Sequence, residues 1–86
     1  MTRVTLEQLV AMIGGDRELV TVLVRERIIT SDSGGFSVLD VDRVLAARTL
    51  IRELEVDIGA VEIILRLRAQ LAQARRELAI FRRDDS

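Results

Sequence analysis

The side chains with which this sequence could do chemistry are of few kinds. The 86 residues contain no His, Cys, Lys, Trp or Tyr. The usual general bases, thiol nucleophiles, soft metal ligands and Schiff-base lysines are therefore absent. Ser, Thr, Asp, Glu and Arg remain, and the glycine pairs at residues 14–15 and 34–35 lack the flanking residues of a phosphate-binding or calcium-binding loop. We expect a protein that is not an enzyme and that uses no cofactor and no metal.

Charge instead points to binding. All 13 basic residues are Arg, against 14 acidic residues. Residues 1–56 hold seven Arg and nine acidic residues, a net charge of −2, whereas residues 57–86 hold six Arg and five acidic residues, a net charge of +1. Four of the acids fall close together in the sequence: Glu53, Glu55, Asp57 and Glu62. Two interpretations are open. In the first, Asp57 is a helix cap and the other three are solvated helix residues; in the second, the four form an acidic patch beside aliphatic side chains.

Asp57, Glu62 and the apolar residues that follow them belong to one predicted long helix. Asp57 is a good N-cap, and no Gly or Pro follows Gly59, so we expect one helix over residues 57–86. Such a helix spans about 40 Å at about 1.5 Å per residue. Its apolar residues repeat at spacings of three and four, as in the a and d positions of a coiled coil: Ile64, Leu67, Leu71, Ala74, Leu78 and Phe81.

This apolar stripe predicts self-association. A helix of that length is too long for a head of residues 1–56 to cover, so we expect the stripe to pair with a second copy in a homodimer. Ile58, Val61 and Leu65 lie off the stripe and are expected to close over the core of the head. The structural alternative is that the stripe belongs to the core of a single chain.

The N-terminal residues carry the signals of two short helices. Thr5 and Gln8 form a capping box, and Gly14 is placed to end the helix that starts there. Asp16 is the expected N-cap of a second helix that runs to about residue 27. Two short helices joined by a glycine turn are typical of a helix-turn-helix, although any helical hairpin has the same pattern.

A small β-hairpin is expected next. Residues 28–30 and 36–38 are rich in β-forming side chains and flank a polar, glycine-rich turn at residues 31–35. A flexible surface loop is the alternative. Asp40 is the expected N-cap of a third helix, and residues 55–57 connect that helix to the long one.

The order of these elements, together with the segment LIRELEVDIGAVEIIL at residues 50–65, resembles the chaperone modulators of the CbpM type, within the MerR-like winged helix-turn-helix class. The shared features are a basic-acidic-Leu ending of the third helix, an Asp after two further residues, and a small residue before an aliphatic helix. Gly59 and Ala60 depart from the Pro and Gly often found in the family. The resemblance implies a mainly α fold, with a winged helix-turn-helix-like head and a long C-terminal dimerisation helix.

The same resemblance implies a function. Chaperone modulators of this type bind the J-domain of a DnaJ-type co-chaperone and regulate the recruitment of Hsp70. Because J-domains present a basic helix, the candidate contacts are the acids Glu53, Glu55, Asp57 and Glu62. The sequence has neither an apolar N-terminal run typical of a signal peptide nor about 20 consecutive apolar residues for a membrane span, so we expect a cytoplasmic protein with no membrane contact.

Two alternatives stay open. One is a MerR-like DNA-binding transcriptional regulator, and the other is a homodimeric module with a different partner. Against DNA, the second helix offers only Arg17 near its start, between Asp16 and Glu18, and the head has a net negative charge. The direction of helix pairing is also open. Glu77 opposite Arg82 of a second copy favours a parallel pair, whereas the MerR-like class dimerises antiparallel.

Overall fold

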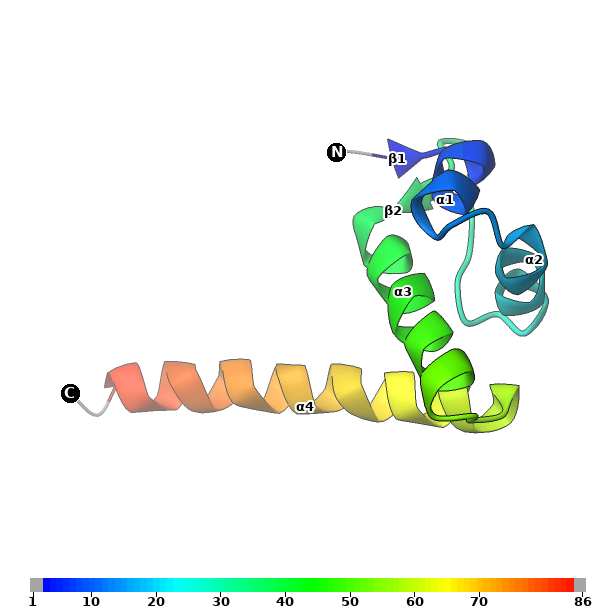
Figure 1. Cartoon of the computed structure of the whole chain (residues 1–86). Helices are drawn as coiled ribbons and strands as arrows, with labels where there is room; N and C mark the ends of the chain where they lie inside the picture. Colours follow the sequence, from blue (N-terminus) through cyan, green and yellow to red (C-terminus); the bar gives the residue numbers. More distant parts are fainter. Residues whose placement is uncertain (1–2, 85–86) are drawn as a thin grey trace.

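Residues 3–84 of the computed structural model form a small head from which one long helix projects (Figure 1). The elements are β1 (Arg3–Val4), α1 (Leu6–Met12), α2 (Arg17–Arg25), β2 (Phe36–Ser37), α3 (Val38–Glu53) and α4 (Ile58–Asp84). The expected mainly helical fold with a long C-terminal helix is confirmed. Residues 1–2 of the predicted head and residues 85–86 of the predicted helix lie outside the described residues. Within residues 3–84, no helix is both long enough and apolar enough to cross a membrane.

The caps of the first two helices are those that the sequence predicts. The backbone N–H of Gln8 donates to Thr5 Oγ1 at 3.1 Å, and the N–H of Thr5 donates to Gln8 Oε1 at 2.8 Å, which completes the capping box of α1. Gly14 follows this helix with φ of 84°, a conformation that glycine adopts without steric cost. Asp16 caps α2, because its Oδ1 accepts a hydrogen bond from the N–H of Leu19 at 3.0 Å.

The predicted hairpin is wrong in its strand pairing. A small antiparallel sheet is present, but β2 pairs with β1, and the register places Arg3 opposite Ser37 and Val4 opposite Phe36. Residues 28–30 form no strand; Ile28 and Ile29 are buried in the core. Ile28 and Ile29 are common strand residues because their branched side chains pack well, and here they pack in the core without forming a strand.

A tight turn precedes β2 and lets the two strands meet. Asp32 and Gly35 form an isolated antiparallel bridge, and Gly35 has φ of 100°. A Cβ atom at Gly35 would clash with the carbonyl oxygen of Val4. Glycine is therefore required here both for its conformation and for the close approach of the backbone of β1.

The third helix begins earlier than the sequence analysis placed it. Ser37, and not Asp40, is the N-cap of α3. The N–H of Asp40 donates to Ser37 Oγ at 3.1 Å, and Asp40 Oδ2 accepts from the N–H of Ser37 at 3.1 Å. Asp40 thus occupies the position of the capping box that Glu or Gln usually fills, and its side chain is nearly buried. The prediction of Asp40 as N-cap is wrong because its carboxylate acts one turn inside the helix.

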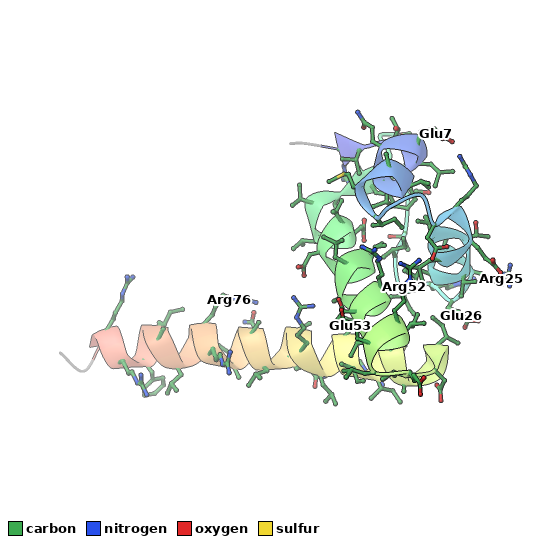
Figure 2. The ribbon with its side chains drawn as sticks, in the orientation of Figure 1. Glu7, Arg25, Glu26, Arg52, Glu53 and Arg76 are labelled. Carbon is green, nitrogen blue, oxygen red and sulfur yellow. The ribbon has the colours of Figure 1, made fainter. Side chains whose placement is uncertain are left out.

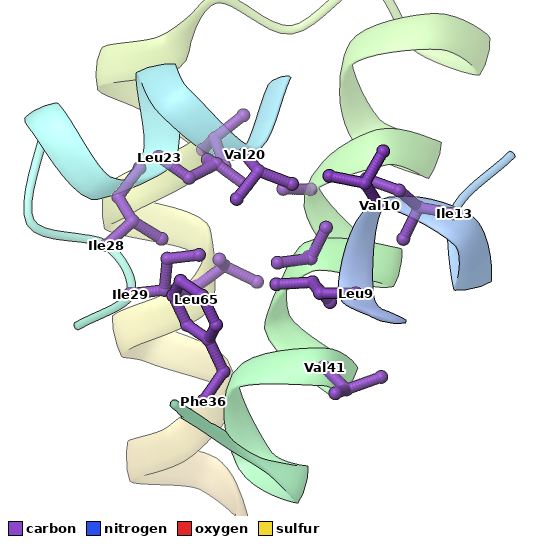
Figure 3. Close-up of a cluster of buried hydrophobic side chains, with 13 residues drawn as sticks. Leu9, Val10, Ile13, Val20, Leu23, Ile28, Ile29, Phe36, Val41 and Leu65 are labelled. Atoms are coloured by element: carbon purple, nitrogen blue, oxygen red, sulfur yellow. The ribbon is translucent and has the colours of Figure 1, made fainter. Parts of the chain in front are cut away.

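The core lies where the three helices of the head meet the first turns of α4 (Figure 3). The fully buried side chains include Leu9 of α1 and Ile13 at its C-cap, Val20 and Leu23 of α2, and Val44 of α3. From α4, Val61 and Leu65 are buried and Ile58 is partly buried against them. The prediction that these three residues close over the head is confirmed.

A short connection turns the chain from α3 into α4. The N–H of Val56 donates to the carbonyl of Leu50 at 3.1 Å, and Glu55 takes the left-handed conformation with φ of 54°. Asp57 Oδ1 then accepts from the N–H of Ala60 at 2.9 Å, so Asp57 caps α4 as predicted. The two helices diverge from this junction, and α4 runs on past the head (Figure 1).

Candidate interaction surfaces

The apolar stripe of α4 lies outside the core. Leu71 is 52% exposed and Phe81 is 72% exposed. Leu67, Ala74 and Leu78 are also exposed, and Ile64 is half-buried. At about 100° per residue, Leu71 is turned by about 120° from Leu65, which faces the core. The structure therefore places five of the six predicted stripe residues on a side of the helix that the head does not cover, and Ile64 lies at the edge of the covered part.

One flank of this stripe is already engaged within the chain. Arg68, Arg75 and Arg82 follow the stripe at intervals of seven residues. Arg68 Nη2 lies 3.0 Å from Asp42 Oδ2 of α3, so this guanidinium is tied to the head. The other two follow farther along the projecting part of the helix. A second copy that approaches the stripe therefore meets the paired Arg68 near the head and two more arginines beyond it.

The four predicted acidic contacts are all exposed, but they do not share one hollow. Asp57 is the cap of α4 and lines a groove beside α2. Glu62 lies 3.9 Å from Arg66, an i,i+4 pair of the kind expected on a helix surface. Glu53 lines a separate small depression at the end of α3, next to Arg52 (Figure 2). Glu55 lies in the connection between the helices.

The groove that Asp57 lines is the acidic groove. It has a volume of about 350 Å³ and lies between the start of α2 and the junction of α3 with α4. Three carboxylates and five aliphatic side chains surround it: Asp16, Glu18 and Asp57, with Leu19, Val22, Ile51, Val56 and Ile58. The combination of an aliphatic floor with carboxylates at its edge suits a basic amphipathic segment of another protein.

Asp16 and Glu18 are the residues of this groove that the sequence analysis missed. Asp16 caps α2 and also accepts from Arg52 Nη2 at 3.0 Å, which links α2 to the end of α3. Glu18 forms no ion pair with any residue of the described range 3–84. Both acids are far from Asp57 in the sequence, and no spacing rule connects them.

Arg17, the candidate base-reading residue of α2, is held by a neighbour. Its Nη2 donates to both carboxylate oxygens of Glu7, each at 2.7 Å. The hydrogen bond to Glu7 and, after it, the Glu7 charge raise the pKa of the Arg17 guanidinium. A contact between Arg17 Nη2 and a base edge requires that these two hydrogen bonds be broken first.

A larger hollow of about 560 Å³ lies between the start of α1, α2 and residues 31–36. Its apolar side chains include Leu6, Val24 and Phe36, and its polar edge consists mainly of hydroxyl groups. The charged residue of its lining, Asp32, is 2.9 Å from Arg3 Nη2. The hollow therefore offers little charge with which to select a partner.

Within residues 3–84, no three His, Cys, Asp or Glu side chains come together in an arrangement that could hold a metal ion. Comparisons of the chain with protein-family models, with curated proteins and with solved structures gave no match.

Proposed function

We propose that this chain is a cytoplasmic chaperone modulator that binds the J-domain of a DnaJ-type co-chaperone and regulates the recruitment of Hsp70. The observation that carries the proposal is the acidic groove, which offers three carboxylates around an aliphatic floor. A J-domain presents a basic helix, and that helix matches the groove in charge and in amphipathic character. The protein acts by stoichiometric binding, without a cofactor.

The groove and the family resemblance coincide in the sequence. Residues 50–65 carry the resemblance, and they supply Ile51, Val56, Asp57 and Ile58 of the groove lining. The remaining lining residues come from the N-terminus of α2. A J-domain helix in this groove would contact both parts of the head. The groove would then control whether the basic helix is free to reach Hsp70.

The head is proposed to be a winged helix-turn-helix of the MerR-like kind that does not read DNA. The order of α1, α2, β2 and α3 supports this assignment, with the tight turn at residues 32–35 in the place of the wing. Two observations weigh against the alternative of a DNA-binding regulator. Glu7 holds Arg17, and the acidic residue in the turn, Asp32, is paired with Arg3. The arginine at the start of α2 and the arginine beside the turn are thus both paired with acids, and the exposed Arg25 lies at the opposite end of α2.

The active form is proposed to be a homodimer held by the stripe of α4. Five of the six stripe residues are exposed in the single chain, and apolar side chains at heptad spacing are typical of a helix that pairs. The stripe and the acidic groove are formed by different residues. Pairing of two copies through the stripe therefore uses no lining residue of the acidic groove.

The test of partner and groove is calorimetry of the full chain with an isolated J-domain. We expect Glu18→Arg to weaken binding about tenfold, which corresponds to about 1.4 kcal/mol, because the new charge repels the basic helix. Glu18 is exposed and unpaired among the described residues, so the fold should be unchanged. Glu26→Arg at the C-terminus of α2 is the matched control, with affinity within about twofold of wild type.

Two results would contradict this proposal. Absence of wild-type binding at tens of micromolar would reject the J-domain as partner. Equal weakening by Glu18→Arg and Glu26→Arg would keep the partner and reject the acidic groove. A third variant replaces the predicted contacts Glu55 and Glu62 with Arg. These acids lie outside the groove, so we expect slower association and a smaller salt dependence, with little change in dissociation.

A further inference from the structure

A hollow face of the opposite charge lies in the angle between α3 and α4. Two adjoining hollows, of about 320 Å³ and about 260 Å³, share Arg43, Leu65 and Ala69 in their linings. They form one surface, the arginine groove, which extends from the end of α2 across the start of α3 to the middle of α4. Arg76 projects into it from the side of α4 on which the head lies (Figure 2).

The arginine groove has an excess of positive charge. Its lining holds five arginines and two acids: Arg27, Arg43, Arg66, Arg68 and Arg76, with Asp42 and Glu62. The two acids are paired with Arg68 at 3.0 Å and with Arg66 at 3.9 Å. Five positive and two negative groups give the lining a charge of +3, and Asp40, a buried neighbour outside the lining that lies 3.8 Å from Arg43, lowers the local excess to +2. This excess contrasts with the acidic groove on the other side of the α3–α4 junction.

The floor of the arginine groove is apolar. Leu39, on the first turn of α3, is 71% exposed and faces Ala69 and Ala72 of α4 across the hollow. Leu65 and Ile28, both buried, close the base. An exposed leucine opposite two alanines leaves space for apolar side chains of a partner, since alanines take up little volume.

Arg27 is held at the edge of this groove by an unfavourable backbone conformation. Its φ is 59°, in the left-handed region that residues with a side chain rarely adopt. Its N–H donates to the carbonyl of Val24 at 3.0 Å, which ends α2 and directs the chain toward Ile28. Within residues 3–84, Arg27 forms no ion pair. The N–H of Ile28 donates to the carbonyl of Leu23 at 2.9 Å, so Arg27 is the left-handed residue of a Schellman motif, which fixes its place beside the groove.

We propose that the arginine groove binds an acidic amphipathic helix of a partner protein. Carboxylates of such a helix would meet the guanidinium groups at the rim, where bidentate pairs form readily. Its apolar side chains would cover Leu39 and the alanines of α4. A nucleic acid would meet the arginines but would leave this apolar floor uncovered, and the groove lining contains no aromatic side chain on which a base could stack.

A second copy of the chain is not the occupant. From α4 the groove uses Leu65, Arg68, Ala69, Ala72 and Arg76, whereas the stripe residues are turned by about 100° to about 180° from Leu65. Arg68 is the residue that the groove shares with the flank of the stripe, and it is already paired with Asp42, so a second copy on the stripe would meet the groove only at this edge. The proposal is also independent of J-domain binding in the acidic groove, because the two grooves have no lining residue in common; of the four predicted J-domain contacts, Glu62 lines the arginine groove.

The test uses a fluorescein-labelled 16-residue helical peptide with Leu at positions i, i+3, i+4 and i+7 and Glu on its other face. We expect saturable binding to the full chain by anisotropy, weakened by added salt. Leu39→Asp should lower the affinity at least about tenfold. The double substitution Arg43→Gln and Arg76→Gln should do the same through loss of charge. Both sites are exposed, so circular dichroism should show an intact fold.

Matched controls separate this groove from other surfaces. Arg25→Gln with Arg75→Gln removes two arginines outside the groove, and we expect affinity within about twofold of wild type. Glu18→Arg in the acidic groove should also leave the peptide bound. The same peptide with Lys in place of Glu should bind the wild-type groove at least tenfold more weakly.

Four results would overturn the proposal. The first is no binding of the acidic peptide by a folded chain. The second is equal binding of the Lys peptide. The third is loss of peptide binding with Leu71→Asp and Leu78→Asp but not with Leu39→Asp, which would place the peptide on the stripe. The fourth is displacement of the peptide by a duplex or single-stranded oligonucleotide whose binding is lost when Arg43 and Arg76 are replaced. That result would show that the groove binds the phosphate groups of a nucleic acid.

Discussion

At the scale of single residues, the start of α3 shows how two short polar side chains fix the position of a helix. Ser37 Oγ accepts from the N–H of Asp40 at 3.1 Å and donates to Asp40 Oδ2 at 2.9 Å. Asp40 Oδ2 also accepts from the N–H of Ser37, so this oxygen of the nearly buried carboxylate receives two hydrogen bonds from one residue, while Oδ1 lies 3.8 Å from Arg43 Nη1. The same pair places Phe36 in the core and Leu39 at the surface.

We expect Ser37→Ala to lower the free energy of unfolding by about 1 kcal/mol, because it removes the cap and one partner of Asp40. In a domain of this size such a loss lowers Tm by about 4–8 °C. Urea denaturation at a fixed protein concentration measures it. Ser33→Ala, in the exposed turn before β2, is the control and should change stability by less than about 0.5 kcal/mol. Equal effects of the two substitutions would show that the cap adds nothing.

The residue scale also shows why some features were predictable and others were not. The Thr5–Gln8 box and the cap at Asp57 are local patterns, and both were predicted correctly. The cap of α3 was missed because Asp40 stands where Glu or Gln usually completes the box. Asp16 and Glu18 meet Asp57 only through the tertiary fold, so the acidic groove could not be read from spacing.

At the scale of elements, α4 has two roles on two sides. Its first turns complete the core through Val61 and Leu65, and its remaining turns carry the exposed stripe. Both roles follow from periodicity, which the sequence displays over the whole helix. The pairing of β1 with β2 follows from no such signal. Strands of two residues have no period to detect, and the segment at residues 28–30 had a stronger β composition than β1.

We expect Leu71→Asp with Leu78→Asp to convert a dimer into a monomer. Both leucines are exposed in the single chain, so the fold of the head should be unaffected, while two unpaired carboxylates in an apolar interface cost several kcal/mol. Light scattering at tens of micromolar measures the mass. Ile80→Asp, exposed but off the stripe, is the control and should remain a dimer. A monomeric wild-type chain at that concentration would contradict the proposed dimer.

The direction of pairing has a separate measurement. The chain contains no cysteine, so Phe81→Cys introduces one thiol per copy. A parallel pair in register places the two thiols side by side, and oxidation gives a covalent dimer. In an antiparallel pair the two thiols lie at opposite ends, and a covalent dimer forms instead from a mixture of Phe81→Cys and Ile64→Cys chains. The pair of Arg68 with Asp42 reduces the repulsion between arginines that the antiparallel arrangement brings together.

At the scale of the whole molecule, charge is separated between two sides of the α3–α4 junction. The acidic groove adjoins α2, and the arginine groove lies between α3 and the middle of α4. The net charge of −1 conceals this separation. Composition alone therefore predicted a weakly acidic head and gave no indication of a basic hollow. The arginines that form it come from two helices, α3 and α4, and from the turn after α2.

We expect duplex DNA to bind weakly and without sequence preference. Arg17 is held by Glu7, and the arginine groove lies away from the N-terminus of α2, which is the recognition position of a helix-turn-helix. Mobility shifts at physiological salt with random and promoter duplexes measure this. A preference above about a thousandfold for one sequence, the lower edge of the usual specificity range, would replace the chaperone proposal with the DNA-binding alternative. Glu7→Gln, which frees Arg17, is the informative variant.

The length of α4 beyond the head has a consequence for valency. Residues 66–84 extend the helix by about 28 Å at about 1.5 Å per residue. A rigid rod of that length sets the spacing between the two heads of a dimer: adjacent in a parallel pair, and at opposite ends in an antiparallel one. Under the proposed function, a partner with two J-domains would bind both heads of one dimer. The second binding event would then be intramolecular, and the overall affinity would exceed that of a single site. Shortening the rod would alter avidity while each isolated site kept its strength.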